Sequence, residues 1–309
     1  MKMNQVLLLG EALIDLLSDD YAESLSEVQS FIRHAGGSPA NITANLLNLG
    51  EQAILITRIG KDPFGDYLKK SFIEKGIDTT YVQVDEVKNT SLVFVAKSRG
   101  NPKFLPFRSA DYCIERPKGI HNLLKTTAFF HISSWSISHE PARETVFKII
   151  EDIEGTETKL CFDPNFRKIL WKTHEDPMQT LSKVLKKTYL CKPSDDDAFH
   201  IFGMMDNDDY IKEFHKLGAQ NVILTMGKDG ALVSNGQRVI HQKTVSQVVV
   251  DTTGAGDGFW SGVYCGILNR QDIFTAARWG SAVAAFRLRT IGSDLPLPSM
   301  EVIKSEFLM

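Results

Sequence analysis

Residues 251–259 have the residue types and the spacing for handling a phosphate group. They read Asp-Thr-Thr-Gly-Ala-Gly-Asp-Gly-Phe, follow the strand-like run 248–250 and open a helical stretch over 258–268. A glycine-rich turn that enters a helix presents free backbone N–H groups, and the helix dipole adds to their attraction for an anion. Gly254 and Gly256 permit the close approach and the backbone angles that such a turn requires. The block therefore predicts an anion site late in the chain.

Asp257 lies in the first turn of the expected helix, beside that anion. In phosphoryl transfer such a carboxylate can accept the proton of the attacking hydroxyl, while N–H groups stabilise the phosphoryl oxygens. The alternative is that Asp257 only complements the helix dipole. The nine-residue block between strand and helix favours the catalytic interpretation. The sequence has no G-x-x-x-x-G-K-[ST] motif, and a dinucleotide fingerprint would need glycine where Phe259 stands.

Composition narrows the class of protein. The chain has 309 residues, 43% of them hydrophobic, and a formal net charge of −3, so we expect a large core and no nucleic-acid partner. Its four cysteines are far apart and form no C-x-x-C pair, which argues against a zinc or redox site and favours the cytoplasm. We find neither a signal peptide nor an apolar run long enough to cross a membrane.

The elements that must position these residues alternate along the chain. Short apolar runs predict strands, and amphipathic stretches between them predict helices. The strands are expected at 6–10, 53–57, 128–132, 159–163, 189–192 and 222–226. Ser38-Pro39 and Asp62-Pro63 should each start a helix, with Ser38 or Asp62 as the N-cap and proline as the first helical residue. Further helices are expected at 141–153 and 208–217. This order predicts a single α/β domain over 1–309, with a mainly parallel sheet flanked by helices.

Two segments, about 16–35 and 90–108, do not fit the alternation. Residues 91–96 and 103–107 are apolar runs separated by the turn Ser-Arg-Gly-Asn-Pro, which predicts a β-hairpin. We interpret the two segments as a small β-sheet lid over the central sheet. An ordinary edge hairpin is the alternative.

The motifs as a set resemble those of the ribokinase-like, or PfkB, carbohydrate kinases. Residues 251–262 look like the C-terminal signature of that family, and Gly-Gly-Ser-Pro-Ala-Asn at 36–41, followed by Gly50 and Gly60, looks like the N-terminal one. Segments 10–15, 59–65 and 224–230 also match, so the resemblance covers essentially the whole chain. It implies a three-layer ribokinase-like fold with a lid, and transfer of the γ-phosphoryl group of ATP to a sugar hydroxyl with Mg²⁺.

The resemblance also implies roles for single residues. Asp257 matches the catalytic base, and the amides of Ala255, Gly256 and Asp257, next to Gly254, match the anion hole. The positions that match sugar contacts are Asp15, Gly36, Gly37 and Asn41. Without the family pattern, Asp15 could be a turn carboxylate and Asn41 a local cap.

The stretch Asp163-Pro164-Asn165-Phe166-Arg167 resembles a D-P-N-x-R motif of fructokinase-like members. It adds Asp163 and Asn165 to the expected sugar contacts. The planar guanidinium of Arg167 suits the transferred phosphate or the substrate, although it could instead pair with Asp163 on the surface. Arg108, at the exit of the hairpin, looks like a lid residue that reaches the sugar, with a solvated loop arginine as the alternative.

The nucleotide side is expected to follow the next strands. By resemblance it includes Lys192, Ser194, Thr225, Gly227, Gly230 and Ser281, although relatives often carry asparagine at 194 and 281. Asp197 stands where many relatives have glutamate, and we expect it to act through water near Mg²⁺. A monovalent cation such as K⁺ is expected near Asp251, Thr253 and the loop around residues 292–293.

Fructokinase is the first choice of activity, because the segments 10–15, 107–111 and 163–167 resemble those of the fructokinase branch of the family. A 2-keto-3-deoxygluconate kinase is the second, and ribokinase and aminoimidazole riboside kinase follow. A catalytically silent sugar sensor on the same scaffold is the alternative from another class. The resemblance also implies a possible homodimer through the lid.

Overall fold

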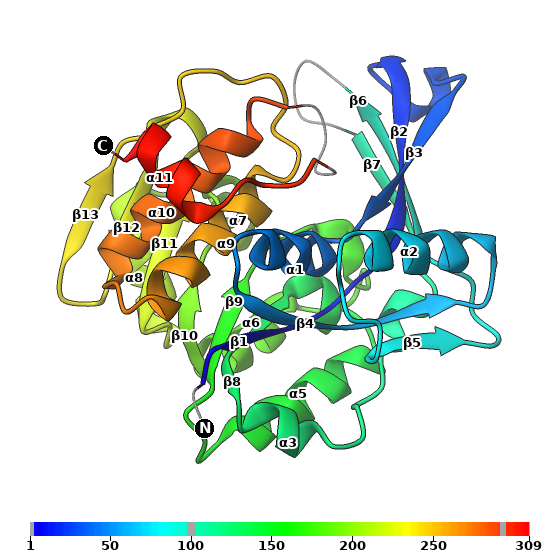
Figure 1. Cartoon of the computed structure of the whole chain (residues 1–309), viewed down its shortest axis with the longest axis horizontal. Helices are drawn as coiled ribbons and strands as arrows, with labels where there is room; N and C mark the ends of the chain where they lie inside the picture. Colours follow the sequence, from blue (N-terminus) through cyan, green and yellow to red (C-terminus); the bar gives the residue numbers. More distant parts are fainter. Residues whose placement is uncertain (1–2, 98–102, 291–294, 309) are drawn as a thin grey trace.

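A nine-stranded sheet forms the centre of the molecule. The computed structural model describes residues 3–97, 103–290 and 295–308. The strands of this sheet are β1 (Gln5–Leu9), β4 (Gln52–Gly60), β5 (Val82–Asp85), β8 (Thr127–Ser133), β9 (Lys159–Asp163), β10 (Thr188–Cys191), β11 (Asn221–Thr225), β12 (Ala231–Ser234) and β13 (Val239–Gln242). Their order is β13-β12-β11-β10-β9-β8-β1-β4-β5 (Figure 1). Pairs from β11 to β5 are parallel, whereas β12 and β13 are antiparallel additions at one edge.

Helices cover both faces of the sheet. They are α1 (Ser38–Asn48), α2 (Pro63–Glu74), α3 (Ile120–Leu124), α4 (Ser134–Ile137), α5 (Ala142–Ile153), α6 (Pro177–Leu185), α7 (Asp195–Phe202), α8 (Asn207–Lys216), α9 (Ala255–Leu268), α10 (Ile273–Arg287) and α11 (Met300–Phe307). Short 3-10 helices lie at Leu25–Glu27, Ala110–Tyr112, Lys168–Leu170 and Gly227–Asp229. None of the helices in the described ranges is long and apolar enough to cross a membrane.

Alternate residues of the central strands enter different cores. In β1, Val6 and Leu8 pack with α1, α9, α10 and α11, whereas Leu7 and Leu9 pack with α3, α5, α6 and α8. Successive side chains of a strand point to opposite faces, so a strand that is covered on both sides reads as a continuous apolar run. The expected three-layer fold is therefore confirmed.

A second, four-stranded sheet projects from the main body (Figure 1). Its order is β3 (Phe31–Gly36), β2 (Leu13–Tyr21), β6 (Leu92–Lys97) and β7 (Lys103–Phe107). The β6–β7 pair is the hairpin expected from the sequence, and β2 pairs with β6 in parallel. We refer to this four-stranded sheet as the lid sheet.

Two local predictions were wrong. Residues 248–250 form no strand: Val248, Val249 and Val250 are about half exposed or more, and the chain reaches the glycine turn as irregular structure. Ser38 is not the N-cap of α1, because Gly37, with φ of 111°, occupies that position. Ser38 is instead the first helical residue, so its hydroxyl does not cap the helix.

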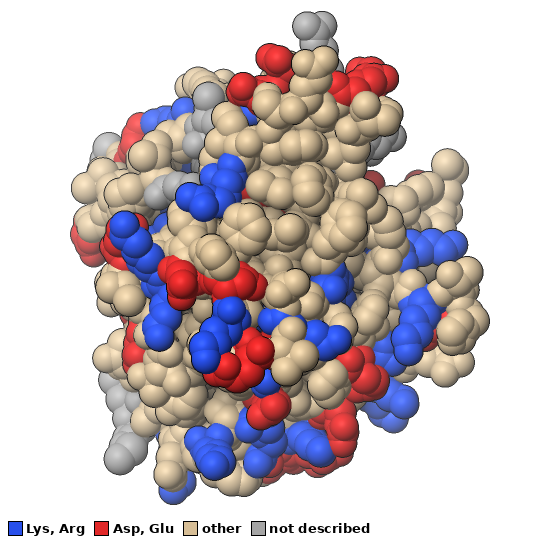
Figure 2. All heavy atoms as spheres, turned by 90° about the vertical axis from the view of Figure 1, so that its right-hand side faces the viewer, with Lys and Arg blue, Asp and Glu red and all other residues tan. Residues whose placement is uncertain are grey.

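The surface carries charges of both signs. On the face drawn in Figure 2, Lys and Arg side chains are interspersed with Asp and Glu over the lower part. Such mixing is typical of a solvated surface.

Candidate active site

The C-terminal ends of the parallel strands bring the predicted site residues to one edge of the sheet. Asp163 ends β9, Lys192 follows β10 and Thr225 ends β11. The N-terminus of α9 lies at the same edge, because Trp260 of α9 donates a hydrogen bond to Asp163 over 2.8 Å. Ligands of α/β proteins bind at this edge of the sheet.

The glycine turn presents two free amides. Gly254 has φ of 76° and caps α9 without a side-chain hydrogen bond. The N–H groups of Gly256 and Asp257 have no acceptor among the described residues, whereas the N–H of Ala255 donates to the carbonyl of Thr252 over 3.2 Å. A Cβ at Gly256 would contact nothing within 4 Å, so the space in front of the turn is open. The turn can hold an anion through the free amides and the helix dipole.

Asp257 joins α9 to α1. Its Oδ1 accepts a hydrogen bond from the Ser38 hydroxyl at 2.6 Å, and its Oδ2 accepts one from the Asn41 side-chain amide at 2.9 Å. The side chain remains partly exposed at the sheet edge. A predicted sugar contact, Asn41, and the predicted base therefore meet directly, although 216 residues separate them.

Burial and nearby charges act in opposite directions on the acids of the site. Burial raises the pKa of Asp257, while the Ser38 and Asn41 donors and the cations Lys192 and Arg287 lower it. Burial also raises the pKa of Asp163, to about 6, against the effect of Lys192. The Lys192 ammonium is almost fully buried and lies 3.7 Å from Asp163. Lys192 therefore lowers the pKa of both carboxyls, Asp163 and Asp257.

Predicted sugar contacts lie at the end of the site where β1 and the lid sheet meet α1. A side chain at Gly36 would collide with the Asp15 carboxylate, and one at Gly37 would collide with the backbone of Glu11. The two glycines therefore let the chain pass close to the acidic residues at 11 and 15. Glu11 itself is buried and accepts the Ser38 N–H over 3.3 Å, and burial raises the pKa of its carboxyl to about 8.

Arg108 lies next to this end, but its guanidinium is held by the protein. It donates to Asp111 from Nε, to Ser138 from Nη1 and to the carbonyl of Trp135 from Nη2. Nη2 also contacts Asp111 at 2.7 Å, and the arginine side chain is only 7% exposed. Arg108 can thus fix the groups around the sugar, and it would have to give up an existing bond in order to bind a substrate directly.

The turn after β9 places Asn165 and Arg167 differently. Asn165 has φ of 33°, a conformation that asparagine tolerates and that commonly marks functional turns. Arg167 is exposed and lies 3.6 Å from Asp197, so its guanidinium is accessible to solvent. Arg167 is therefore the more available of the two predicted arginines.

The predicted nucleotide residues beyond Lys192 lie on several elements. Ser194 and Thr225 form an isolated parallel bridge between the ends of β10 and β11. Gly230 has φ of 88°, and a side chain there would collide with the carbonyl of Gln242. Gly227 begins the short 3-10 helix, and Ser281 is half-buried on α10.

Comparison with known proteins identifies the family. A model described as pfkB family carbohydrate kinase matches residues 3–300. The chain belongs to this family. The expectation of an ATP-dependent sugar kinase is thereby confirmed.

Relatives of this pfkB kinase include fructose-handling enzymes. It is 40% identical over 307 residues to the ATP-dependent 6-phosphofructokinase of Thermoanaerobacterium thermosaccharolyticum, which covers 99% of this chain and 94% of that protein. The solved structure of Halothermothrix orenii fructokinase is 34% identical with a TM-score of 0.81, covering 93% of this chain and 99% of that one. The structure of Xylella fastidiosa fructokinase with bound ATP is 25% identical with a TM-score of 0.85, covering 98% of each chain.

The described residues offer few candidate ligands for a metal ion. In the described ranges, no three His, Cys, Asp or Glu side chains are grouped to hold a metal ion. Mg²⁺ needs only one or two carboxylates beside substrate phosphates. Asp197 is suited to a water-mediated contact only, because its Oδ2 accepts the N–H and hydroxyl of Ser194 and its Oδ1 accepts the N–H of Phe166.

The expected monovalent-cation site is only partly described. Asp251 accepts bonds from the N–H and the hydroxyl of Thr253, at 3.0 and 2.9 Å. Residues 292–293, the remainder of that expected site, lie outside the described residues.

Sequence reasoning missed two residues of the site. The helix-start pattern predicts only a cap at Ser38, although Ser38 belongs to the Gly-Gly-Ser-Pro-Ala-Asn motif, and the resemblance includes Glu11 only as part of a matching segment. The signal for both was their position beside predicted sugar contacts. Only the fold shows that Ser38 contacts Asp257 and that Glu11 is buried.

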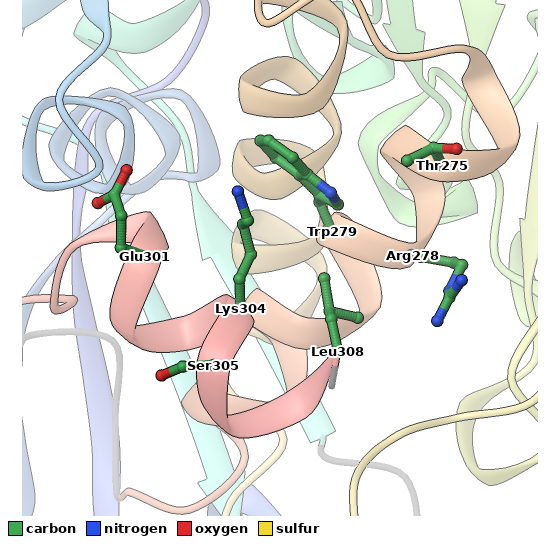
Figure 3. Close-up of a pocket in the computed structure, with 7 residues that line it drawn as sticks. All are labelled: Thr275, Arg278, Trp279, Glu301, Lys304, Ser305 and Leu308. Carbon is green, nitrogen blue, oxygen red and sulfur yellow. The ribbon is translucent and has the colours of Figure 1, made fainter.

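A surface pocket of about 470 Å³ lies apart from this site (Figure 3). Trp279 of α10 and Lys304 of α11 line it, with the Lys304 ammonium 4.4 Å from the centre of the Trp279 ring. It includes none of the predicted catalytic or binding residues.

Proposed function

We propose that the protein transfers the γ-phosphoryl group of ATP to a hydroxyl of free fructose, with Asp257 as the general base. The meeting of Asp257 with α1 at the open glycine turn carries this proposal. This contact supports the proposal because it joins a carboxylate at a helix end with free amides to Asn41, a predicted sugar contact. The fructokinases among its relatives support fructose as the acceptor.

In the proposed reaction, Asn41 and Asp15 orient the sugar so that one hydroxyl reaches Asp257. The hydroxyl oxygen attacks the γ-phosphorus, the bond from that phosphorus to the β–γ bridging oxygen breaks, and ADP leaves with the bridging oxygen. The hydroxyl proton passes to Asp257. The Gly256 and Asp257 amides, Lys192 and Arg167 stabilise charge on the transferred group. Mg²⁺, when bound, supplies charge neutralisation on the phosphates, with Asp197 as its candidate ligand through water.

Fructose 6-phosphate is the second candidate acceptor. The 40% identity to a 6-phosphofructokinase favours it. An acceptor phosphate needs a cation of its own. Arg108 already gives its donors to protein acceptors, and the exposed Arg167 is assigned in this proposal to the transferred phosphoryl group. The same argument weakens 2-keto-3-deoxygluconate, whose carboxylate would need such a cation. Free fructose therefore fits the described residues better.

A panel of acceptors tests the choice. ATP consumption is measured with fructose, fructose 6-phosphate, 2-keto-3-deoxygluconate, ribose, aminoimidazole riboside and glucose, and phosphorus NMR identifies the product. We expect the highest kcat/KM with fructose. A higher kcat/KM with fructose 6-phosphate would show that fructose 6-phosphate, and not fructose, is the preferred acceptor. Saturable sugar binding without turnover would indicate a sensor.

We also propose that the protein is cytoplasmic and forms a homodimer. Cys113, Cys161, Cys191 and Cys265 are free thiols, which supports a reducing cytoplasm. A homodimer through the lid sheet is supported by an apolar face of this sheet that is exposed at the edge strand β7. Phe31, Phe94 and Phe107 form a continuous aromatic row there, with Leu105 beside them.

A further inference from the structure

The Ser38 hydroxyl has an unusual position for the start of a helix. The first residues of helices commonly use a side-chain oxygen to accept backbone N–H groups. Ser38 does not, because Gly37 is the cap and the hydroxyl donates to Asp257 Oδ1 over 2.6 Å. This bond joins the first helix of the chain to the helix that carries the proposed base, across 219 residues.

The two bonds to Asp257 constrain its carboxylate differently. Ser38 holds Oδ1 and Asn41 holds Oδ2, so the plane of the carboxylate is fixed in the absence of sugar. Each carboxylate oxygen has room for a second donor. Asn41 is also an expected sugar contact and can turn to the sugar. Ser38 is then the donor that stays on the base while the sugar hydroxyl approaches.

The backbone of Ser38 is itself anchored to the sheet. Its N–H donates to Glu11 Oε1 over 3.3 Å, just beyond the end of β1. The next residue, Pro39, packs so closely on Gly10 that a Cβ there would lie 2.8 Å from the proline ring. The hydroxyl therefore comes from a fixed point, and pre-organised groups hold a reactive group in place at little entropic cost.

We infer that Ser38 is a positioning residue of the active site, whose hydroxyl sets the orientation of the Asp257 carboxylate for attack by the sugar hydroxyl. This inference rests on the proposed role of Asp257 as the base. Ser38 acts through Asp257 and needs no contact with ATP. Its loss should therefore lower kcat more than it changes KM for ATP.

The pH dependence of kcat gives a second, independent readout. The groups that face Asp257 are Ser38 and Asn41 on α1, Lys192 after β10, Arg287 on α10 and the carboxyl of Asp163 on β9. A hydrogen bond donated to the ionised carboxylate lowers the pKa of Asp257, so its removal raises that pKa. The acid limb of kcat against pH then moves to higher pH, because more of the base is protonated.

The test compares Ser38→Ala, Ser38→Thr and Thr43→Val with the wild type. Thr43 lies on the same helix, is fully buried and bonds only to the carbonyl of Pro39 in the described contacts, so Thr43→Val controls for loss of a hydroxyl from α1. We expect Ser38→Ala to lower the plateau kcat roughly tenfold and to shift the acid limb upward by about one to two pH units. Ser38→Thr should restore both, and Thr43→Val should change neither.

Distinct results separate failure of this inference from failure of the proposed function. An unshifted acid limb in Ser38→Ala, or an equal shift in Thr43→Val, would overturn the positioning role. If Asp257→Ala keeps wild-type turnover, the base assignment itself fails, and with it the basis of the inference. If Asp257→Ala is inactive while Ser38→Ala behaves as wild type, only the role of Ser38 is refuted.

Discussion

The ionised form of Asp257 is stabilised from three parts of the chain. Ser38 and Asn41 donate to it from α1, and the cations Lys192 and Arg287 lower its pKa against the effect of burial. A base that acts on an alcohol must stay charged in a site that also attracts phosphate. Burial raises the pKa of Asp257 overall, and the donors and cations around it offset part of that rise.

Replacing the carboxyl of Asp257 tests its chemical role directly. In Asp257→Asn the side chain keeps its size and can still contact Ser38, but it cannot take a proton. We expect kcat to fall by a factor of ~10²–10⁴, with little change in ATP affinity measured by calorimetry. Asp257→Ala should lose at least as much turnover. Wild-type kcat in either variant would contradict the general-base role.

Glu11 should make the stability of the protein depend on pH. Burial raises its pKa from 4.5 to about 8, so between these values the folded protein keeps a proton that the unfolded chain has lost. The contribution of Glu11 is therefore complete below pH 4.5 and is lost as pH rises towards 8, with a slope of up to about 1.4 kcal/mol per pH unit.

Glu11→Gln removes this titration while keeping an acceptor for the Ser38 N–H. We expect urea unfolding at pH 6 and pH 8 to show a smaller loss of stability in the variant than in the wild type. Asp163 and Asp257 titrate in both proteins, so the difference between the two slopes isolates Glu11. Parallel slopes would show that the Glu11 carboxyl is ionised in the folded protein.

At the scale of the elements, strong local signals were sufficient for most of the fold. Asp62 caps α2 with bonds to the N–H groups of Phe64 and Gly65, as Asp-Pro at that point predicts. Strand β9 has the predicted bounds because both of its faces are covered. The strand prediction for residues 248–250 was wrong because a run of β-branched residues does not by itself provide a partner strand to pair with. The Ser38–Asp257 contact was beyond sequence reasoning, since it depends on how α1 and α9 pack.

The packing of α9 on α10 depends on glycine. A Cβ at Gly262 would lie 2.5 Å from the carbonyl oxygen of Trp279 and 2.7 Å from Cα of Gly280. Both are backbone atoms, so no side chain can turn away to relieve the clash. Helix propensity favours alanine over glycine by about 1 kcal/mol, but overpacking against backbone costs about 1–3 kcal/mol.

We therefore expect Gly262→Ala to lower the free energy of unfolding despite its better helix propensity. Thermal and urea denaturation measure the loss. Gly76→Ala is not a suitable control because Gly76 has φ of 75°, whereas Gly256→Ala meets open space and tests the turn instead. Ser305→Ala, on the exposed side of α11, is the matched control and should leave stability within about 0.5 kcal/mol. An unchanged free energy of unfolding in Gly262→Ala would mean that α9 and α10 can move apart without a loss of stability.

At the scale of the whole molecule, the site joins segments that are far apart in the sequence. The Gly-Gly-Ser-Pro-Ala-Asn motif comes from the first 41 positions and the glycine turn from the last 60, and the central sheet brings them together with the strand ends from the middle of the chain. The lid sheet, which projects from the body in Figure 1, exposes apolar side chains on its edge strand β7. Phe104 packs on Trp135 on one face of this sheet, and the aromatic row lies on the other face. The inner part of that second face packs on α2 through Leu16 and Leu92, whereas its part on the edge strand β7 stays exposed.

The exposed apolar side chains of β7 predict the oligomeric state of the protein. Phe107 is 55% exposed and Leu105 is 41% exposed, a costly arrangement for neighbouring apolar side chains in water. We expect light scattering to give the wild type a mass near twice 34.6 kDa, and Phe107→Glu to reduce it to that of one chain, because the new charge would be buried against a second copy. Met204→Glu adds the same charge at a position that is 90% exposed on the body, and it should remain dimeric. A wild-type monomer at micromolar concentration, or a Phe107→Glu dimer, would show that the aromatic row does not join two copies.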